Sequence, residues 1–103
     1  MPPVKELCHP KILFMWRSGN PSQQELVRCL YTFMLHGKNI TDTAKALFIH
    51  RNTLTYRLER LSELFETDFN QINSDTLFYL LVSCMLLVDS KPLKSDEAAI
   101  PET

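Results

Sequence analysis

Two helical patterns joined by a very short connection constrain the fold of this chain more than any other feature. The first pattern covers residues 42–48, and the second begins at Arg51. The second pattern places its apolar side chains at i, i+4 and i+7, the spacing of one helix face: Leu54, Leu58 and Leu61. Because only two residues separate the patterns, the apolar faces of the two helices must pack against each other. The sequence therefore predicts two packed helices within residues 41–65.

Further helical patterns lie on both sides of this pair, and strand-like alternation is almost absent. An apolar cluster after Pro10 predicts a short helix, residues 22–36 predict a longer one, and residues 75–89 predict a last one. Together these segments predict an all-α bundle of about five helices. We divide the chain into residues 1–21 with a short helix and a turn, residues 22–89 with a helix-turn-helix domain, and residues 90–103 as a flexible polar tail.

The predicted helices begin at residues that are typical helix caps. Ser22 and Glu25 have the spacing of a capping box, and Thr41 is suited to cap the short helix of the central pair. The last helix has two candidate caps, Asn73 and Ser74. These residues predict where three of the helices start.

Positive φ angles are expected where helices stop, and glycine adopts them most easily. Gly37 fits this role at the end of the helix over residues 22–36. In the connection of the central pair, the position that usually holds glycine is occupied by Phe48. A bulky residue there means that the backbone is strained or that the turn is built in another way.

The composition is that of one globular domain with an uneven charge. The 103 residues are 45% hydrophobic and carry a net charge of −1, which excludes a uniformly basic surface. Residues 36–60 hold five basic and two acidic side chains, whereas residues 61–103 hold two basic and eight acidic ones. This asymmetry predicts one binding face for a polyanion, although chance clustering on a solvated surface gives the same pattern.

Several other classes of protein are disfavoured. The three cysteines, Cys8, Cys29 and Cys84, include no C-x-x-C pair, so neither a disulfide framework nor a structural zinc site is expected. The first residues lack a signal-peptide pattern, and the near-apolar run over 76–88 is shorter than the roughly 20 residues that cross a bilayer. No catalytic motif or metal-ligand spacing is found, so we expect a small cytoplasmic protein that is not an enzyme and needs no cofactor.

The short helix followed by a longer one is the layout of a helix-turn-helix, whose second helix lies in the major groove of DNA. The first turn of that helix presents His50, Arg51, Asn52 and Thr53. Arginine can bridge guanine O6 and N7, and asparagine can bridge adenine N6 and N7. Two ordinary packed helices would share the spacing, but side chains suited to reading bases favour DNA binding.

Individual residues of this first turn have competing roles. Arg51 is expected to contact a base, with a phosphate clamp as the alternative. His50 is expected to cap the helix or touch a phosphate rather than read a base. Thr53 contacts a phosphate or is simply solvated. Free backbone N–H groups at the start of the helix add a site for an anion.

Residues around the first turn extend the predicted interface. The ring of Tyr56 lies on the sugar-phosphate chain or packs against the preceding helix. Arg57 is expected to reach a phosphate, and Arg60 to pair with an acidic neighbour or with solvent. Lys45 and Lys38 are expected to contact the DNA backbone.

The segment from Ala44 to Leu61, AKALFIHRNTLTYRLERL, closely resembles the C-terminal DNA-binding domain of the PucR family. The resemblance extends from about residue 9 to the last apolar helix, and residues 50–58 carry its most specific part. It implies a helix-turn-helix similar to the factor-for-inversion-stimulation type, in a bacterial regulator of purine catabolism or sugar-diacid use. It also implies a sensory region N-terminal to this domain, so that the chain is a fragment of a longer protein.

The resemblance also implies roles for single residues. By position, His50, Arg51, Thr53 and Arg57 approach DNA, and Asn52 stabilises the entry turn. The family often has a glycine after the recognition helix, where this chain has Glu66-Thr67.

The last predicted helix is apolar on nearly all sides from Leu77 to Val88. Such a helix must be buried all round, and a bundle of this size offers little interior. We therefore expect part of it to form a homodimer contact, with a central core helix wrapped by the others as the alternative.

These patterns together predict sequence-specific binding of double-stranded DNA by the output domain of a transcription regulator. The alternative is a protein-interaction or dimerisation module without DNA binding. RNA binding is disfavoured, because aromatic residues that could stack on bases are scarce near the basic segment.

Overall fold

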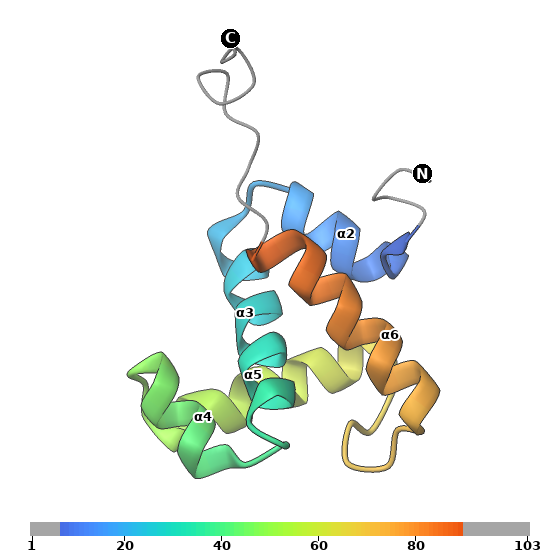
Figure 1. The fold of residues 1–103 in the computed structure, drawn as a ribbon. Helices are drawn as coiled ribbons and strands as arrows, with labels where there is room; N and C mark the ends of the chain where they lie inside the picture. Colours follow the sequence, from blue (N-terminus) through green and yellow to red (C-terminus); the bar gives the residue numbers. More distant parts are fainter. Residues whose placement is uncertain (1–6, 90–103) are drawn as a thin grey trace, which may run out of the picture.

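The computed structural model describes residues 7–89, which are entirely helical apart from their connections (Figure 1). The elements in chain order are α2 (Pro10–Arg17), α3 (Pro21–Leu35), α4 (Ile40–Leu47), α5 (Arg51–Phe65), α6 (Ser74–Cys84) and a π-helical turn, η1 (Met85–Asp89). The prediction of an all-α bundle of about five helices is confirmed. The tail predicted over residues 90–103 lies outside the described residues. Within the described part, no helix is long and apolar enough to span a bilayer.

The central helix of the bundle is α3, which packs against α2, α4, α5 and α6 (Figure 1). Its buried side chains are Leu26, Val27, Cys29, Leu30, Tyr31, Phe33 and Met34. By contrast, α6 buries only Leu80, Ser83 and Cys84, and its Phe78 is 67% exposed. The alternative that the last helix is wrapped by the others is therefore wrong. α3 takes the central place because helices pack along several of its sides, whereas α6 contacts the bundle through one face.

A small apolar cluster separate from the main core lies where α3, α4 and α5 meet. It consists of the buried residues Cys29, Ala44 and Leu54, one from each helix. Partly buried apolar side chains close it from the outside: Ile40, Leu47, Ile49 and Leu58. The small side chain of Ala44 lets the backbones of α4 and α5 approach closely. This cluster fixes the positions of α4 and α5 relative to α3.

Each helix begins after a side chain that accepts a hydrogen bond from a backbone N–H two or three residues later: His9, Asn20, Asn39, His50 and Asn73. The caps predicted at Ser22 and Thr41 are wrong, because each helix starts earlier, after an asparagine two residues before. Pro21 occupies the first position of α3, where the missing N–H costs no helical hydrogen bond. Of the two caps predicted for the last helix, the asparagine is the one used.

Replacing Asn39 by alanine should lower the free energy of unfolding by about 1 kcal/mol, because the Asp42 N–H loses its acceptor at 2.8 Å. Thr41 is exposed inside α4, so Thr41→Ala should leave stability unchanged or raise it slightly through helix propensity. Urea denaturation of the two variants measures both effects. Equal losses in the two variants would contradict the assignment of the cap.

Candidate nucleic-acid interface

The connection between α4 and α5 is a tight turn around Phe48. The backbone of Phe48 is left-handed, with φ 58° and ψ 41°. The Phe48 N–H donates to the Lys45 carbonyl at 3.2 Å, and the Ile49 N–H donates to the Ala44 carbonyl at 3.1 Å. These two bonds form a Schellman motif, which usually has glycine at the left-handed position. The turn is therefore built in the usual way, and the strain falls on the bulky residue that the sequence singled out.

The imidazole of His50 caps the start of α5, as the sequence predicts. Its Nδ1 accepts a hydrogen bond from the Asn52 N–H at 3.0 Å, while the Leu54 N–H donates to the His50 carbonyl at 3.1 Å. Because Nδ1 accepts, the proton of the neutral ring lies on Nε2 and remains available to a ligand. Asn52 contributes its backbone N–H to this entry turn, and its side chain is exposed.

The polar side chains of α5 point away from the bundle. Leu54 and Leu61 are buried on the inner face, whereas the outer face carries only exposed side chains: Arg51, Asn52, Thr53, Thr55, Tyr56, Glu59 and Arg60. The Tyr56 side chain is 65% exposed, so it does not pack tightly against the preceding helix. The outer face of the first two turns of α5 is therefore accessible to solvent.

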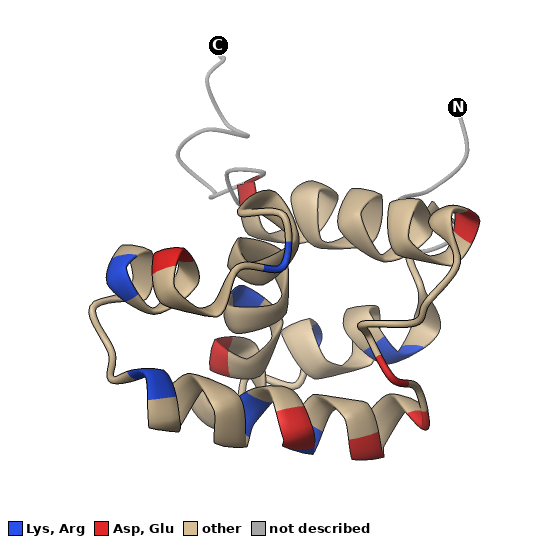
Figure 2. Cartoon of the chain, turned by 90° about the horizontal axis from the view of Figure 1, so that it is seen from below, with Lys and Arg blue, Asp and Glu red and all other residues tan. Residues whose placement is uncertain are grey.

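Charge changes sign along α5 (Figure 2). Lys45 and Arg51, on the two sides of the turn, are both exposed, and within residues 7–89 neither takes part in an ion pair. Toward the other end of the helix and the loop after it, four exposed acidic residues outnumber the two exposed cations, Arg60 and Lys11: Glu59, Glu63, Glu66 and Asp68. A polyanion is therefore attracted to the turn and the start of α5, and repelled from the end of α5.

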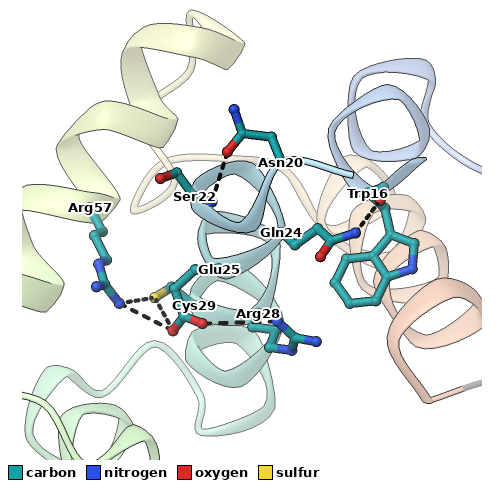
Figure 3. Close-up of polar contacts among 8 residues, drawn as sticks. All are labelled: Trp16, Asn20, Ser22, Gln24, Glu25, Arg28, Cys29 and Arg57. Carbon is teal, nitrogen blue, oxygen red and sulfur yellow. Dashed lines mark hydrogen bonds and ion pairs between the residues drawn. The ribbon is translucent and has the colours of Figure 1, made fainter. Parts of the chain in front are cut away.

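The side chain of Arg57 extends toward α3 and is only partly exposed, at 28%. Its Nη1 donates to Glu25 Oε2 at 3.1 Å and lies 3.6 Å from the sulfur of Cys29 (Figure 3). Position 57 lies at the edge of the leucine face of α5, one turn after Leu54 and one turn before Leu61, and its side chain leaves the helix toward α3. The guanidinium therefore joins α5 to α3 instead of facing outward.

Glu25 lies between two arginines instead of closing the predicted capping box. Besides Arg57, it has Arg28 at 4.0 Å on its own helix (Figure 3). Burial raises the pKa of the neighbouring Cys29 thiol, and the hydrogen bond from Arg57 opposes part of this rise. The thiol is thus protonated at neutral pH, and the net charge of the group comes from the two arginines and the glutamate.

Two other predicted residues have partners within the chain. The Lys38 ammonium donates to the Phe69 carbonyl at 3.3 Å, which draws it toward the loop after α5. Arg60 lies 4.0 Å from Glu63, in agreement with the expected acidic neighbour. In the part of the chain that the structure describes, no three His, Cys, Asp or Glu side chains are placed to hold a metal ion. Among the predicted residues, Lys45 and the first turn of α5 remain exposed at the surface.

The comparison with known families decides the identity of this fold. Residues 26–86, from the middle of α3 to the beginning of η1, match the model of the PucR C-terminal helix-turn-helix domain. The chain belongs to this family. The matched range includes α4 and α5, and the resemblance to the PucR family is confirmed.

Several curated proteins are similar over this domain. The carbohydrate diacid regulator of Escherichia coli is 46% identical over 55 residues, covering 53% of this chain and 14% of the regulator. The DNA-binding transcriptional activator AdeR of Bacillus subtilis is 38% identical over 58 residues, or 56% of this chain and 14% of the activator. The chain thus matches only a small part of the length of these relatives. No solved structure matches it significantly.

The ion pair between Arg57 and Glu25 should stabilise the packing of α5 on α3. A double-mutant cycle with Arg57→Met and Glu25→Gln should give a coupling energy of about 0.5–1 kcal/mol in urea denaturation, since both side chains are partly buried. The same cycle at Arg60 and Glu63, whose side chains are more exposed, should give a coupling energy near zero. Equal coupling energies at the two pairs would contradict the special role of Arg57.

Proposed function

We propose that this chain binds double-stranded DNA in a sequence-specific manner, as the output domain of a bacterial transcription regulator. The observation that carries the proposal is the exposed first turn of α5, with Arg51, Asn52 and Thr53 beside Lys45. Family membership supports it, because the similar curated proteins are named as transcription regulators.

Base reading is assigned to the side chains that leave the start of α5. Arg51 can donate two hydrogen bonds to guanine O6 and N7, and Asn52 can bridge adenine N6 and N7. Thr53 can contact a thymine methyl or a phosphate. Because Leu54 fixes the opposite face of the helix in the small cluster, these side chains enter the groove from a rigid support.

Phosphate binding is assigned to groups around the turn. The first three N–H groups of a helix have no acceptor within it, and His50 occupies only that of Asn52. The N–H groups of Arg51 and Thr53 therefore remain for a phosphate, together with Nε2 of His50 and the Lys45 ammonium. The phenol of Tyr56 lies one turn further on and can rest on the sugar-phosphate chain.

Arg57 and Lys38 take different roles in this proposal from those expected of exposed cations. Arg57 is a positioning residue, because its bond to Glu25 sets how α5 lies on α3. The charge of Lys38 adds to the positive electrostatic potential near the helix-turn-helix. Its ammonium also donates a hydrogen bond to the Phe69 carbonyl in the loop after α5.

The proposal also places this domain within a larger cytoplasmic protein. The similar regulators are several times longer than the segment they share with this chain. We propose that a sensory region lies N-terminal to the domain and controls it, and that the protein works in the cytoplasm, where bacterial DNA is found.

A homodimer would present two recognition helices to one operator. The exposed apolar side chains of the last helical segment support a contact there: Phe78, Tyr79 and Met85. Two copies of α5 would then have to lie about 34 Å apart to reach successive major grooves. This contact is also the basis of the competing proposal, in which the domain only dimerises or binds another protein.

Arg51→Ala should reduce the affinity for a cognate duplex by about 1–3 kcal/mol and relax the base preference at one position. Arg60→Ala serves as the control, since Arg60 is equally cationic but lies near Glu63 in the acidic half of α5. Duplexes selected from a random pool, followed by fluorescence anisotropy, measure both variants. Uniform weakening on all sequences would make Arg51 a phosphate clamp.

Binding of random duplex at low salt separates DNA binding from the competing proposal. Affinity should fall steeply as salt is added, because each phosphate contact releases counterions. If no duplex is bound at low salt, the protein-interaction module is the better explanation.

Sedimentation over a dilution series should show a dimer that dissociates as the protein is diluted. Phe78→Ser should shift the equilibrium toward monomer. Phe14→Ser should not, although Phe14 on α2 is similarly exposed at 73%. A strict monomer at high concentration would exclude the dimer.

A further inference from the structure

The phenyl ring of Phe48 is the most exposed large apolar side chain in residues 7–89, at 94%. The backbone of the same residue is left-handed, which a Cβ atom makes unfavourable. A ring in water also gains no stabilisation from burial. Phe48 is therefore unfavourable for the folded state in two separate ways.

The turn itself does not require a phenylalanine. α3 ends in the same pattern of hydrogen bonds at Gly37, where the Gly37 N–H donates to Met34 and the Lys38 N–H donates to Phe33. With φ 63°, Gly37 adopts this conformation without a side chain. Nothing in the described fold explains why position 48 is not also glycine. A strained residue that the fold does not need is a candidate for function.

The position of Phe48 indicates what its ring would meet. It lies three residues from Lys45 and three from Arg51, the two exposed cations on either side of the turn. Both cations are exposed, and the proposed function assigns both to the contact with a duplex. If Lys45 and Arg51 bind phosphates of the duplex, the ring of Phe48 between them would contact DNA instead of solvent. The apolar groups that a duplex offers there are the thymine methyl and the deoxyribose.

We propose that Phe48 is a DNA-contacting residue whose ring packs against an apolar group of the duplex, at the edge of the groove that α5 enters. This inference rests on the proposed function and adds to it a contact that no hydrogen-bonding residue provides. In the complex, the free energy gained by this contact compensates for the backbone strain at Phe48. In the unbound protein the strain is not compensated.

The test compares Phe48→Gly with Glu66→Gly in the full chain. Glu66 is a matched control, because it ends α5 in the same left-handed conformation, with φ 52°, but lies in the acidic half of the helix. Both variants should be more resistant to urea, since both remove a left-handed residue that carries a Cβ. Only Phe48→Gly should bind the selected duplex more weakly, by about tenfold, as expected when part of an aromatic side chain is left in water.

Two more variants distinguish the effect of the apolar side chain on binding from the effect of a more flexible backbone at position 48. Phe48→Asn tolerates the left-handed conformation but is polar, so it should bind as weakly as Phe48→Gly. Phe48→Leu keeps an apolar side chain and should recover most of the affinity. Weak binding by Phe48→Leu together with full binding by Phe48→Asn would overturn the apolar contact.

Duplexes with deoxyuridine in place of thymine distinguish the two apolar partners. If the methyl is the partner, the original chain loses more affinity on the deoxyuridine duplex than Phe48→Gly does, because any methyl contact of Thr53 is lost equally in both. If the deoxyribose is the partner, the difference between the two proteins persists on both duplexes. Equal affinity of Phe48→Gly and Glu66→Gly would overturn this inference and leave the proposed function intact. Failure of the original chain to bind any duplex would overturn both.

Discussion

The packing of three helices around Cys29, Ala44 and Leu54 is the constraint on which the rest of this structure depends. Each helix contributes one buried residue to the cluster, so a shift of any one helix disrupts its close packing with the other two. It turns the leucine face of α5 inward and leaves the opposite face to solvent. The bond between Arg57 and Glu25 reinforces the same orientation from the flank of α5. The start of α5 therefore projects as a rigid edge.

The surface of α5 is divided both around the helix and along it. Around the helix, leucines pack inward, Arg57 bridges to α3, and polar side chains face outward. Along the helix, Arg51 and the capped N-terminus attract anions, whereas Glu63 and Glu66 repel them. These two patterns together make the α4–α5 connection and the first two helical turns of α5 the most favourable place for a polyanion.

The sequence predicted the elements of the fold well, because their signals are local. The spacing of Leu54, Leu58 and Leu61 identified α5, and Phe48 was expected either to be strained or to mark a turn built in another way. Capping residues were less predictable, because serine, threonine and asparagine all suit this role. Which of them caps a helix depends on the backbone path just before the first turn. The bond of Arg57 to Glu25 was not predicted, because its partner lies 32 residues away and no local pattern reveals such a contact. Contact with DNA was not tested by any of these observations and stays a prediction.

The account rests on the claim that one end of α5 meets the duplex. Amide chemical shifts of the isotope-labelled chain, followed while a selected duplex is added, test this claim residue by residue. The account predicts that the largest changes fall on residues 45–56 and that residues 63–68 change little. Changes concentrated on α6 or α2, with residues 45–56 unaffected, would contradict it.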